Sequence, residues 1–284
     1  MLENKACLVR GLRAPRGSAR LVRVRVVSLT CSNTEIVCAL GCADYLVGVD
    51  DHSDYPVQIV TRLPRVGPDL GIDVARVAAL DPDLVLASLT VPGHERIVAQ
   101  LEAAKLPFFA PEPVSLADVY DDIAQIASRL GVPERGSELA LQMQRAMPER
   151  LKPKRPPRLL VEWWPKPVIV PGRRSWVHDL IERVGADNPF GARAVKSTPI
   201  RDEEAVAAAP DAVIMSWCGV RLEKYRPDVV YRRPEWQRIP ALTERRVFAV
   251  AEAFLGRPGP RLVEGYRALA EIVQSIERFS ASSI

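Results

Sequence analysis

The sequence lacks the short motifs by which many enzymes are recognised. It has no G-x-G-x-x-G segment, no P-loop, no G-x-S-x-G turn and no H-E-x-x-H helix. It also has no apolar run near the ~20 residues that a membrane-spanning helix requires. Cys31, at a predicted helix start that would lower its pKa, is the best candidate nucleophile. We therefore expect a protein that is not an enzyme, with a Cys31-based enzyme or redox sensor as the alternative.

Cysteine is scarce, with five residues and no C-x-x-C pair. An odd number of unpaired cysteines argues against a disulfide framework and is typical of a reducing compartment. The residues before Val24 contain no apolar core long enough for a secretory signal. These features predict a cytoplasmic protein, or a periplasmic or cell-surface one if the start is misassigned.

Positive charge is concentrated at one end of the chain. The net charge is +4, and residues 1–25 contain seven basic residues against Glu3 alone. The rest of the chain is therefore slightly acidic, without the basic stripe that nucleic-acid binding requires. We expect residues 1–22 to form a mobile basic tail and the body to bind neither nucleic acid nor membrane.

Strand and helix signals alternate along the remaining sequence, which predicts mainly parallel sheets flanked by helices. The apolar run Val24–Leu29 predicts a strand, and Ser32 and Glu35 after it predict a capping box. Asp73 predicts the N-cap of another helix. We expect an α/β protein of two Rossmann-like lobes joined by a single long helix. The predicted parts are an N-terminal lobe at 23–132, a bridging helix at 133–151 and a C-terminal lobe at 152–284.

Ligands of α/β sheets sit beyond the carboxyl ends of the strands. The residues expected to bind a ligand there are Cys31, Ser32, Asn33, His52, Tyr55, Ser88, Trp163, Trp164, Trp217, Cys218, Phe254 and Arg257. We assign no catalytic residue and no metal site, because three histidines are too few for a typical metal cage. His52 is a candidate cobalt ligand, with a hydrogen-bonding or turn role as the alternative.

Aromatic residues make up only 6% of the chain, yet three tryptophans and Phe254 fall at predicted strand ends of the second half. Flat aromatic walls with a few polar groups suit a broad, apolar-faced ligand. Packing of the same tryptophans into the core is the alternative. Because adjacent strand residues point to opposite faces, Trp163 and Trp164 can play different roles.

Several segments together resemble the helix-linked class of ABC-type substrate-binding proteins, of the cobalamin- and siderophore-binding type. They are SNTEIVCALG (32–41), VGVDDHSDYP (47–56), LPRVG (63–67), DVARVAALDPDLVLAS (73–88), AVAAAPDAVIMS (205–216) and RPGPRLVEGYRALAEI (257–272). The chain is most similar to the cobalamin-binding members. The resemblance implies non-catalytic binding of a corrinoid, cobalamin first, in a cleft between the lobes, with no intrinsic cofactor.

The same resemblance leaves a ferric siderophore or haem, bound for iron uptake, as the alternative ligand. Anionic siderophores call for several arginines, and the candidates are Arg173, Arg174, Arg193 and Arg257. The family also docks on an ABC importer permease through one glutamate in each lobe. Glu203 matches the second-lobe position, but Ala75 occupies the first, so one docking contact is absent.

Overall fold

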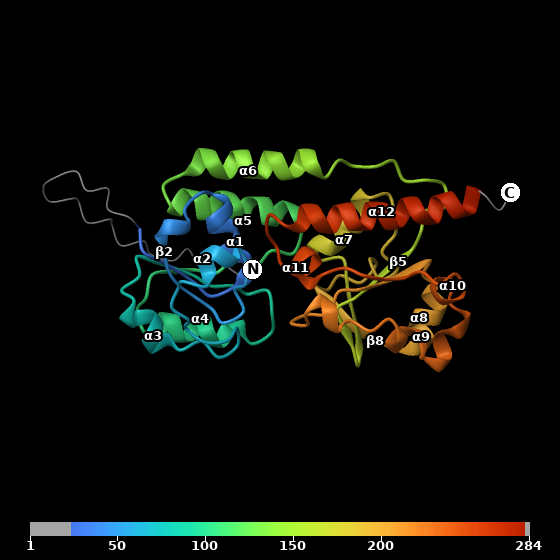
Figure 1. The fold of residues 1–284 in the computed structure, drawn as a ribbon, viewed down its shortest axis with the longest axis horizontal. Helices are drawn as coiled ribbons and strands as arrows, with labels where there is room; N and C mark the ends of the chain where they lie inside the picture. The colour runs from blue at the N-terminus through green and yellow to red at the C-terminus, as the bar shows by residue number, and fades with distance from the viewer. Residues whose placement is uncertain (1–23, 282–284) are drawn as a thin grey trace, which may run out of the picture. The chain divides into compact units, whose positions relative to one another are not determined.

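The computed structural model describes residues 24–281, and the predicted basic tail at 1–22 lies outside them. The chain forms two compact units. The first unit contains the chain up to Glu112 together with Asp122–Ser137, and the second contains Pro113–Asp121 and everything from Glu138 onward. Each unit contains a parallel sheet with helices (Figure 1), and the second unit has an antiparallel sheet as well, so the predicted class, two α/β lobes with mainly parallel sheets, is confirmed. No helix among residues 24–281 is both long and apolar enough to cross a membrane.

The first unit contains a four-stranded parallel sheet in the order β2-β1-β3-β4. The strands are β1 (Val26–Ser28), β2 (Leu46–Val49), β3 (Leu84–Leu86) and β4 (Phe108–Phe109). Val27 of β1 pairs with Gly48 on one side and with Val85 on the other. The chain moves outward from β1 in one direction to β2 and in the other to β3. This reversal of strand order marks the place where α/β sheets form a ligand crevice.

Helices lie on both faces of this sheet (Figure 1). They are α1 (Cys31–Ala39), the 3-10 turn η1 (Ala43–Tyr45), α2 (Val57–Val60), α3 (Val74–Ala79) and α4 (His94–Ala103). Ile97 and Leu101 of α4 pack with Val27 and Val85 in one buried cluster. Asp73 accepts hydrogen bonds from two amides of α3, which confirms the predicted N-cap.

The predicted capping box at Ser32 and Glu35 is wrong. Helix α1 begins at Cys31, and Thr30, in an extended conformation, is its N-cap without a side-chain hydrogen bond. Ser32 and Glu35 therefore lie inside the helix, and both are buried. The amide of Thr34 donates to the carbonyl of Thr30 instead, and the N-cap therefore lies two residues before the predicted one at Ser32.

Two helices of 14 residues each, α5 (Leu116–Arg129) and α6 (Pro133–Ala146), contribute residues to both units. Gly136 of α6 packs closely on α5, because a Cβ there would lie 2.5 Å from the Cβ of Ala127. Helix α6 ends at Ala146, before Pro148, as expected for the residues that precede a proline. The predicted domain boundaries remain predictions.

The second unit contains two three-stranded sheets. The parallel one has the order β10-β9-β5, from β5 (Leu159–Glu162), β9 (Ala212–Met215) and β10 (Val247–Ala249). The antiparallel one has the order β6-β7-β8, from β6 (Trp164–Pro165), β7 (Val168–Pro171) and β8 (Ser197–Ile200). Strand β8 was not expected from the sequence, because only Ile200 in it is buried and its residues are otherwise polar or proline.

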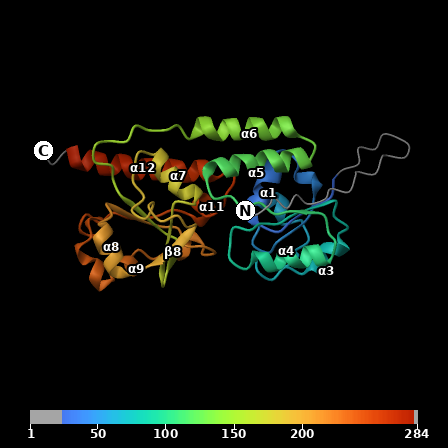
Figure 2. The ribbon, with the colours of Figure 1, turned by 180° about the vertical axis from the view of Figure 1, so that it is seen from behind.

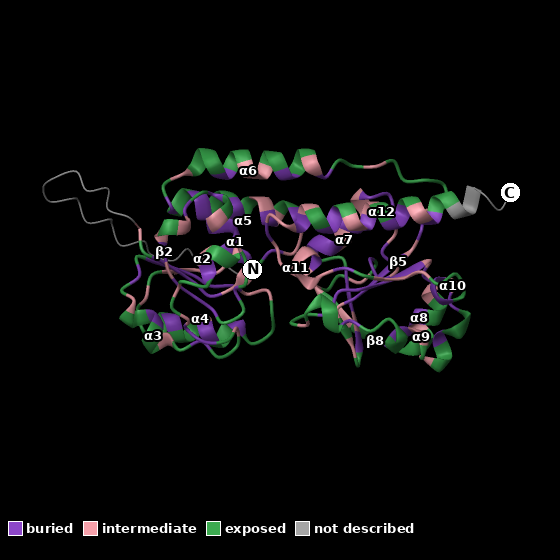
Figure 3. Ribbon diagram, viewed as in Figure 1, coloured by how far each residue is buried: buried purple, intermediate pink, exposed green. Residues whose placement is uncertain are grey.

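Helices also cover the second unit on two sides (Figure 2). They are α7 (Trp176–Arg183), α8 (Asp202–Ala208), α9 (Asp228–Tyr231), α10 (Pro240–Thr243), α11 (Glu252–Leu255) and α12 (Leu262–Ala281), with 3-10 turns η2 (Leu222–Lys224) and η3 (Pro234–Arg238). Strands β5, β7 and β9 form the buried interior (Figure 3). Trp236, fully buried, packs with Leu160, Val213 and Met215 and so attaches the short helices between β9 and β10 to the sheet.

Candidate ligand-binding site

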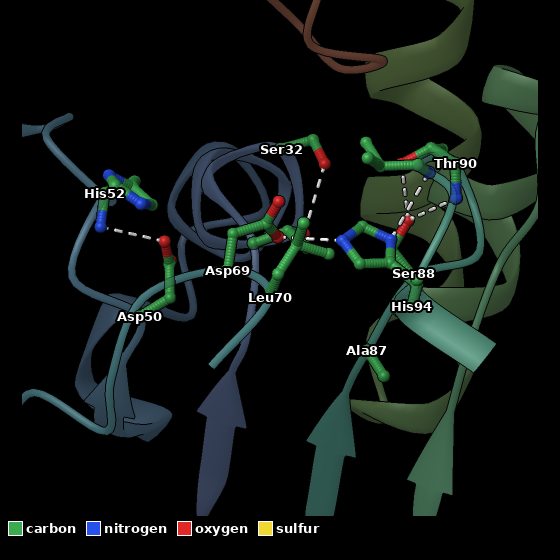
Figure 4. A network of polar contacts seen from close by, with 12 residues as sticks. Ser32, Asp50, His52, Asp69, Leu70, Ala87, Ser88, Thr90 and His94 are labelled. Carbon is green, nitrogen blue, oxygen red and sulfur yellow. Dashed lines mark hydrogen bonds and ion pairs between the residues drawn. The ribbon is translucent and has the colours of Figure 1, made fainter. Parts of the chain in front are cut away.

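Polar side chains gather beyond the carboxyl ends of β1, β2 and β3 in the first unit (Figure 4). Thr34 on α1 is the centre of one group, because its hydroxyl lies 2.8 Å from the hydroxyls of both Ser28 and Ser53. Ser53 in turn donates to Asp50 Oδ1 at 2.5 Å, and the amide of His52 donates to Asp50 Oδ2 at 2.9 Å. These bonds connect the loop after β2 to the start of α1.

Asp50 is almost completely buried, and burial raises the pKa of its carboxyl above the ordinary value. The hydrogen bonds from Ser53 and from the His52 amide act in the opposite direction. Arg65 adds two further bonds from Nη1, to the carbonyls of Asp50 and Ser53 at 2.7 and 2.8 Å. The bonds from the Ser53 hydroxyl, the His52 amide and the Arg65 guanidinium therefore hold the backbone of residues 50–53 in place.

The same loop exposes two side chains that were predicted to bind a ligand. His52 is exposed, and Tyr55 is 47% exposed. Imidazole and phenolate are both axial ligands of iron in haem proteins. Within residues 24–281 no three side chains of His, Cys, Asp or Glu gather as a cage for a bare metal ion. Any metal contact from this loop would therefore use one or two side chains.

Segment 67–72 is attached to the neighbouring loops. The carbonyl of Gly67 accepts from the amide of Asp51, the amide of Gly67 donates to Asp51 Oδ1, and Gly67 has a φ of +110°. A Cβ at Gly67 would lie 2.7 Å from the carbonyl oxygen of Gly71, so the turn requires glycine. On the other side, His94 Nε2 lies 2.8 Å from Asp69 Oδ1 (Figure 4). The loops after β2 and β3 are thereby connected through this segment.

His94 is 4% exposed at the start of α4. Its Nδ1 accepts a long hydrogen bond from the amide of Val91, at 3.4 Å. The tautomer assigned from this bond carries its proton on Nε2, which then donates to Asp69. Arg96, also on α4, donates to the carbonyl of Leu70 at 2.6 Å.

The other predicted residues of the first unit are less accessible. Asn33 is 2% exposed and donates through Nδ2 to the carbonyl of Ala87 at 2.7 Å, which joins α1 to the end of β3. Ser32 and Ser88 are buried, with the Ser88 hydroxyl 2.9 Å from that of Thr90. Cys31 is half-buried. These side chains shape the loops, and their direct contact with a ligand stays a prediction.

In the second unit a buried charge ends β5. Glu162 is completely buried and accepts two bonds from Arg233, from Nη1 at 2.6 Å and from Nη2 at 3.0 Å. It also accepts one from Trp217 Nε1 at 2.9 Å. Trp217 is 6% exposed and packs on Tyr225 with ring centroids 5.2 Å apart. Trp217 thus has a structural role here and offers little surface to a ligand.

The adjacent tryptophans have different environments, as the alternation of side chains in an extended chain requires. Trp163 packs on Trp176, 6.4 Å between ring centroids, and its buried Nε1 has no hydrogen-bond partner among the described residues. Trp164, in β6, is 42% exposed and donates to the carbonyl of Lys166. Trp164 is therefore the accessible one of the two.

The arginines that would favour an anionic ligand have separate partners. Arg257 pairs with Glu252 at 3.1 Å, and Arg193 pairs with Glu204. Arg173 donates through Nε to the carbonyl of Gly191 at 2.9 Å. Arg174 is exposed. Arg257, Arg193 and Arg173 thus each bond to a different part of the second unit.

Of the remaining predicted residues, Cys218 is exposed and Phe254 is half-buried beneath Arg261. Glu203 is exposed on α8, and Ala75 is exposed on α3. Sequence reasoning missed the roles of Glu162 and Arg233. The sequence did contain a signal for this pair, since Glu162 directly follows the apolar run Leu159–Val161. A charged side chain at the end of a buried strand needs a partner of opposite charge.

Comparison with known proteins gives consistent matches over nearly the whole described chain. Residues 26–253 match the family described as periplasmic binding protein. An uncharacterized ABC transporter substrate-binding lipoprotein of Bacillus subtilis, YvrC, is 29% identical over 88% of this chain and 79% of its own length. A vitamin B12-binding protein of Yersinia pestis is 26% identical over 89% of this chain and 87% of its own. The apo structure of the periplasmic heme-binding protein RhuT from Roseiflexus sp. RS-1 has a TM-score of 0.74, is 29% identical, and covers 89% of this chain and 98% of its own.

These matches correct one prediction. The expected cytoplasmic location is wrong, because the matched family is named for periplasmic proteins and the Bacillus subtilis relative is named a lipoprotein. The scarcity of cysteine pairs, one of the two features on which that expectation rested, is compatible with an extracytoplasmic fold whose stability comes from its apolar cores.

Proposed function

The chain belongs to the periplasmic binding protein family, and from that premise we propose that this ABC-type substrate-binding protein binds a corrinoid outside the cytoplasm, with cobalamin as the first candidate. The ligand is bound without being changed chemically. The partner that would receive it is an ABC importer permease, and Glu203 on α8 is the docking residue that this proposal assigns.

The observation that carries the proposal is the placement of His52 and Tyr55. Both side chains are exposed on a loop whose backbone is fixed by Asp50, Ser53 and Arg65. A rigid loop can present two side chains to a ligand with little loss of conformational entropy on binding. The loop follows β2, next to the reversal of strand order at β1, which is where this sheet class binds ligands.

The second unit supports a broad, apolar-faced ligand independently. Trp164 exposes 42% of its surface from the short strand β6. An exposed indole held on a strand suits the flat, partly apolar face of a corrin ring. The Yersinia relative is named a vitamin B12-binding protein, which agrees with this choice.

Titration of the purified protein with cyanocobalamin tests the proposal through the visible absorption bands of the corrin and through tryptophan fluorescence. We expect saturable binding that Trp164→Ala weakens about three- to tenfold, with Trp164→Phe as the matched control that keeps a flat ring. His52→Ala should alter the visible bands only if the imidazole contacts cobalt. A protein that shows no saturable change with cobalamin contradicts the proposal.

Haem is the second candidate, and the same loop is the reason. Tyr55 and His52 both carry groups that ligate haem iron, and the Roseiflexus protein with this fold is named heme-binding. If haem is the ligand, hemin rather than cobalamin should saturate the protein, and Tyr55→Phe or His52→Ala should shift the Soret band. A ferric siderophore is favoured less, because Arg173, Arg193 and Arg257 are already bound to protein groups.

A further inference from the structure

Two loops of the second unit bring three arginines together. Residues 172–174 follow β7, and residues 191–196 precede β8. The amides of Gly172, Arg173 and Arg174 donate to carbonyls of the other loop at 3.1, 2.8 and 3.1 Å. A Cβ at Gly172 would lie 2.8 Å from the carbonyl oxygen of Arg193, so the two loops are in contact. Arg173, Arg174 and Arg193 thus form a basic cluster, and neither loop contains Asp or Glu.

Two members of the basic cluster have donors available for a ligand. Arg174 is exposed, and its side chain has no bonding partner in the part of the chain that the structure describes. Arg173 is also exposed and uses only Nε, which donates to the carbonyl of Gly191 at 2.9 Å. Its two Nη groups remain accessible. Guanidinium groups of this kind match the paired oxygens of a phosphate or a carboxylate.

Glu204 on α8 is the carboxylate that pairs with the basic cluster, through Arg193. The hydrogen bond from the Arg201 amide and the side chain of Arg193 lower the pKa of Glu204 to about 2. The N-terminus of α7 adds positive potential, because Ser175, its N-cap, directly follows Arg174. Three guanidinium groups against one paired carboxylate leave a positive excess at this place in the described chain.

The basic cluster lies at the edge of the second unit where α/β sheets bind ligands. The segment after α7 forms a bridge with the residue before β5, so α7 ends at the amino end of β5 and begins at its carboxyl end. Trp176, the first residue of α7, accordingly packs on Trp163 at the end of β5 and donates to the carbonyl of Leu255 at 2.7 Å. Arg173 and Arg174 directly precede this turn and therefore belong to the ligand-binding edge.

The strand-end loops of the first unit have the opposite charge. Residues 50–57, 67–72 and 87–93 contain four aspartates and no lysine or arginine. Arg65 and Arg96 bond to carbonyls of these loops and compensate only part of that charge. This edge disfavours a ligand that carries negative charge on every side, such as an anionic siderophore complex. A ligand whose negative charge is confined to one end fits both units better.

We propose that Arg173 and Arg174 bind an anionic group of the ligand, a phosphate or a carboxylate. In a corrinoid this group is the phosphodiester of the nucleotide loop, so the protein selects the complete corrinoid over one that lacks the loop. The inference rests on the proposed function, since it concerns the same ligand. In haem the corresponding groups are the two propionates, which lie together at one edge of the ring.

Cobinamide is the discriminating probe, because it contains the corrin ring but lacks the nucleotide loop with its phosphate. Titrations with cyanocobalamin and with dicyanocobinamide are followed by tryptophan fluorescence, and we expect cobinamide to bind about tenfold more weakly. Arg174→Gln should weaken cobalamin about three- to tenfold and leave cobinamide unchanged. Arg174→Lys keeps the charge and should lose less. Arg232→Gln, which removes an exposed arginine on the same unit outside the basic cluster, is the matched control and should change neither Kd.

The outcomes separate this inference from the proposed function. If Arg174→Gln weakens both corrinoids equally, or neither, the inference is overturned and the proposed function stands. If neither corrinoid saturates the protein, the proposed function is contradicted, and hemin and its dimethyl ester then test the basic cluster. Hemin should bind more tightly than the ester, with Arg174→Gln weakening hemin alone, which would identify propionates as the anionic source. An ester that binds as well as hemin, or a protein that binds neither, overturns the inference.

Discussion

Arg233 and Glu162 form a doubly hydrogen-bonded ion pair at the end of β5 in the second unit. The glutamate is fully buried and the arginine is 12% exposed, while the guanidinium also lies 4.3 Å from the ring centroid of Trp236. The pair thereby connects the segment between β9 and β10 to the sheet. A third bond to the same carboxylate fixes Trp217.

Removal of Arg233 should therefore be costly. Arg233→Met leaves the buried carboxylate without its cation, and we expect the free energy of unfolding to fall by about 3–5 kcal/mol. Urea denaturation monitored by tryptophan fluorescence measures this. The double change Glu162→Gln with Arg233→Met is the matched control, because a neutral amide still accepts from Trp217. It should recover much of the loss, and a cost below ~1 kcal/mol for the single change would show that the pair contributes little.

The contact between His94 and Asp69 should control local opening of segment 67–72. His94→Leu removes the donor to Asp69, and we expect faster amide hydrogen exchange in this segment with a stability loss of about 1–2 kcal/mol. Hydrogen exchange resolved by mass spectrometry measures it. Asp69→Asn keeps an acceptor for Nε2–H and should exchange nearly as the unaltered protein does. Unchanged exchange in His94→Leu would mean that other bonds suffice to hold the loop.

Glu204 should contribute to stability in acid. The amide of Arg201 and the side chain of Arg193 lower the pKa of its carboxyl to about 2. A carboxyl whose pKa is lowered by folding stabilises the folded state at pH values above its ordinary pKa of 4.5. This contribution is lost as the pH falls toward 2. Unfolding curves between pH 6 and 2, in comparison with Glu204→Gln, measure the difference. Stability curves that run parallel through this range would contradict the prediction.

The regular elements were predictable because their signals are local. Short apolar runs such as Ala212–Met215 became strands, and Asp73 capped the helix that it precedes. The short helices between Val220 and Thr243 were not predictable, since they are too short for a hydrophobic period and depend on Trp236 packing into the core. Ser32 and Glu35 matched a capping pattern, yet the helix started earlier.

The strand ends were predictable from the sequence, and the burial of the side chains on them was not. Strand ends could be found from the sequence, and they include the exposed His52, Tyr55 and Trp164. Which tryptophan is buried depended on contacts between distant parts of the chain. Trp217 is held by Glu162, 55 residues away, and no local pattern encodes such a pair.

The alternation of the main strands and helices, and with it the α/β class, was determined by the sequence alone, because apolar periodicity and turn chemistry act over a few neighbouring residues. Only the tertiary structure decided which polar groups are satisfied and which remain available. Burial and hydrogen bonding join residues such as Glu162 with Arg233 and Asp69 with His94, and these partners meet only when the chain has folded.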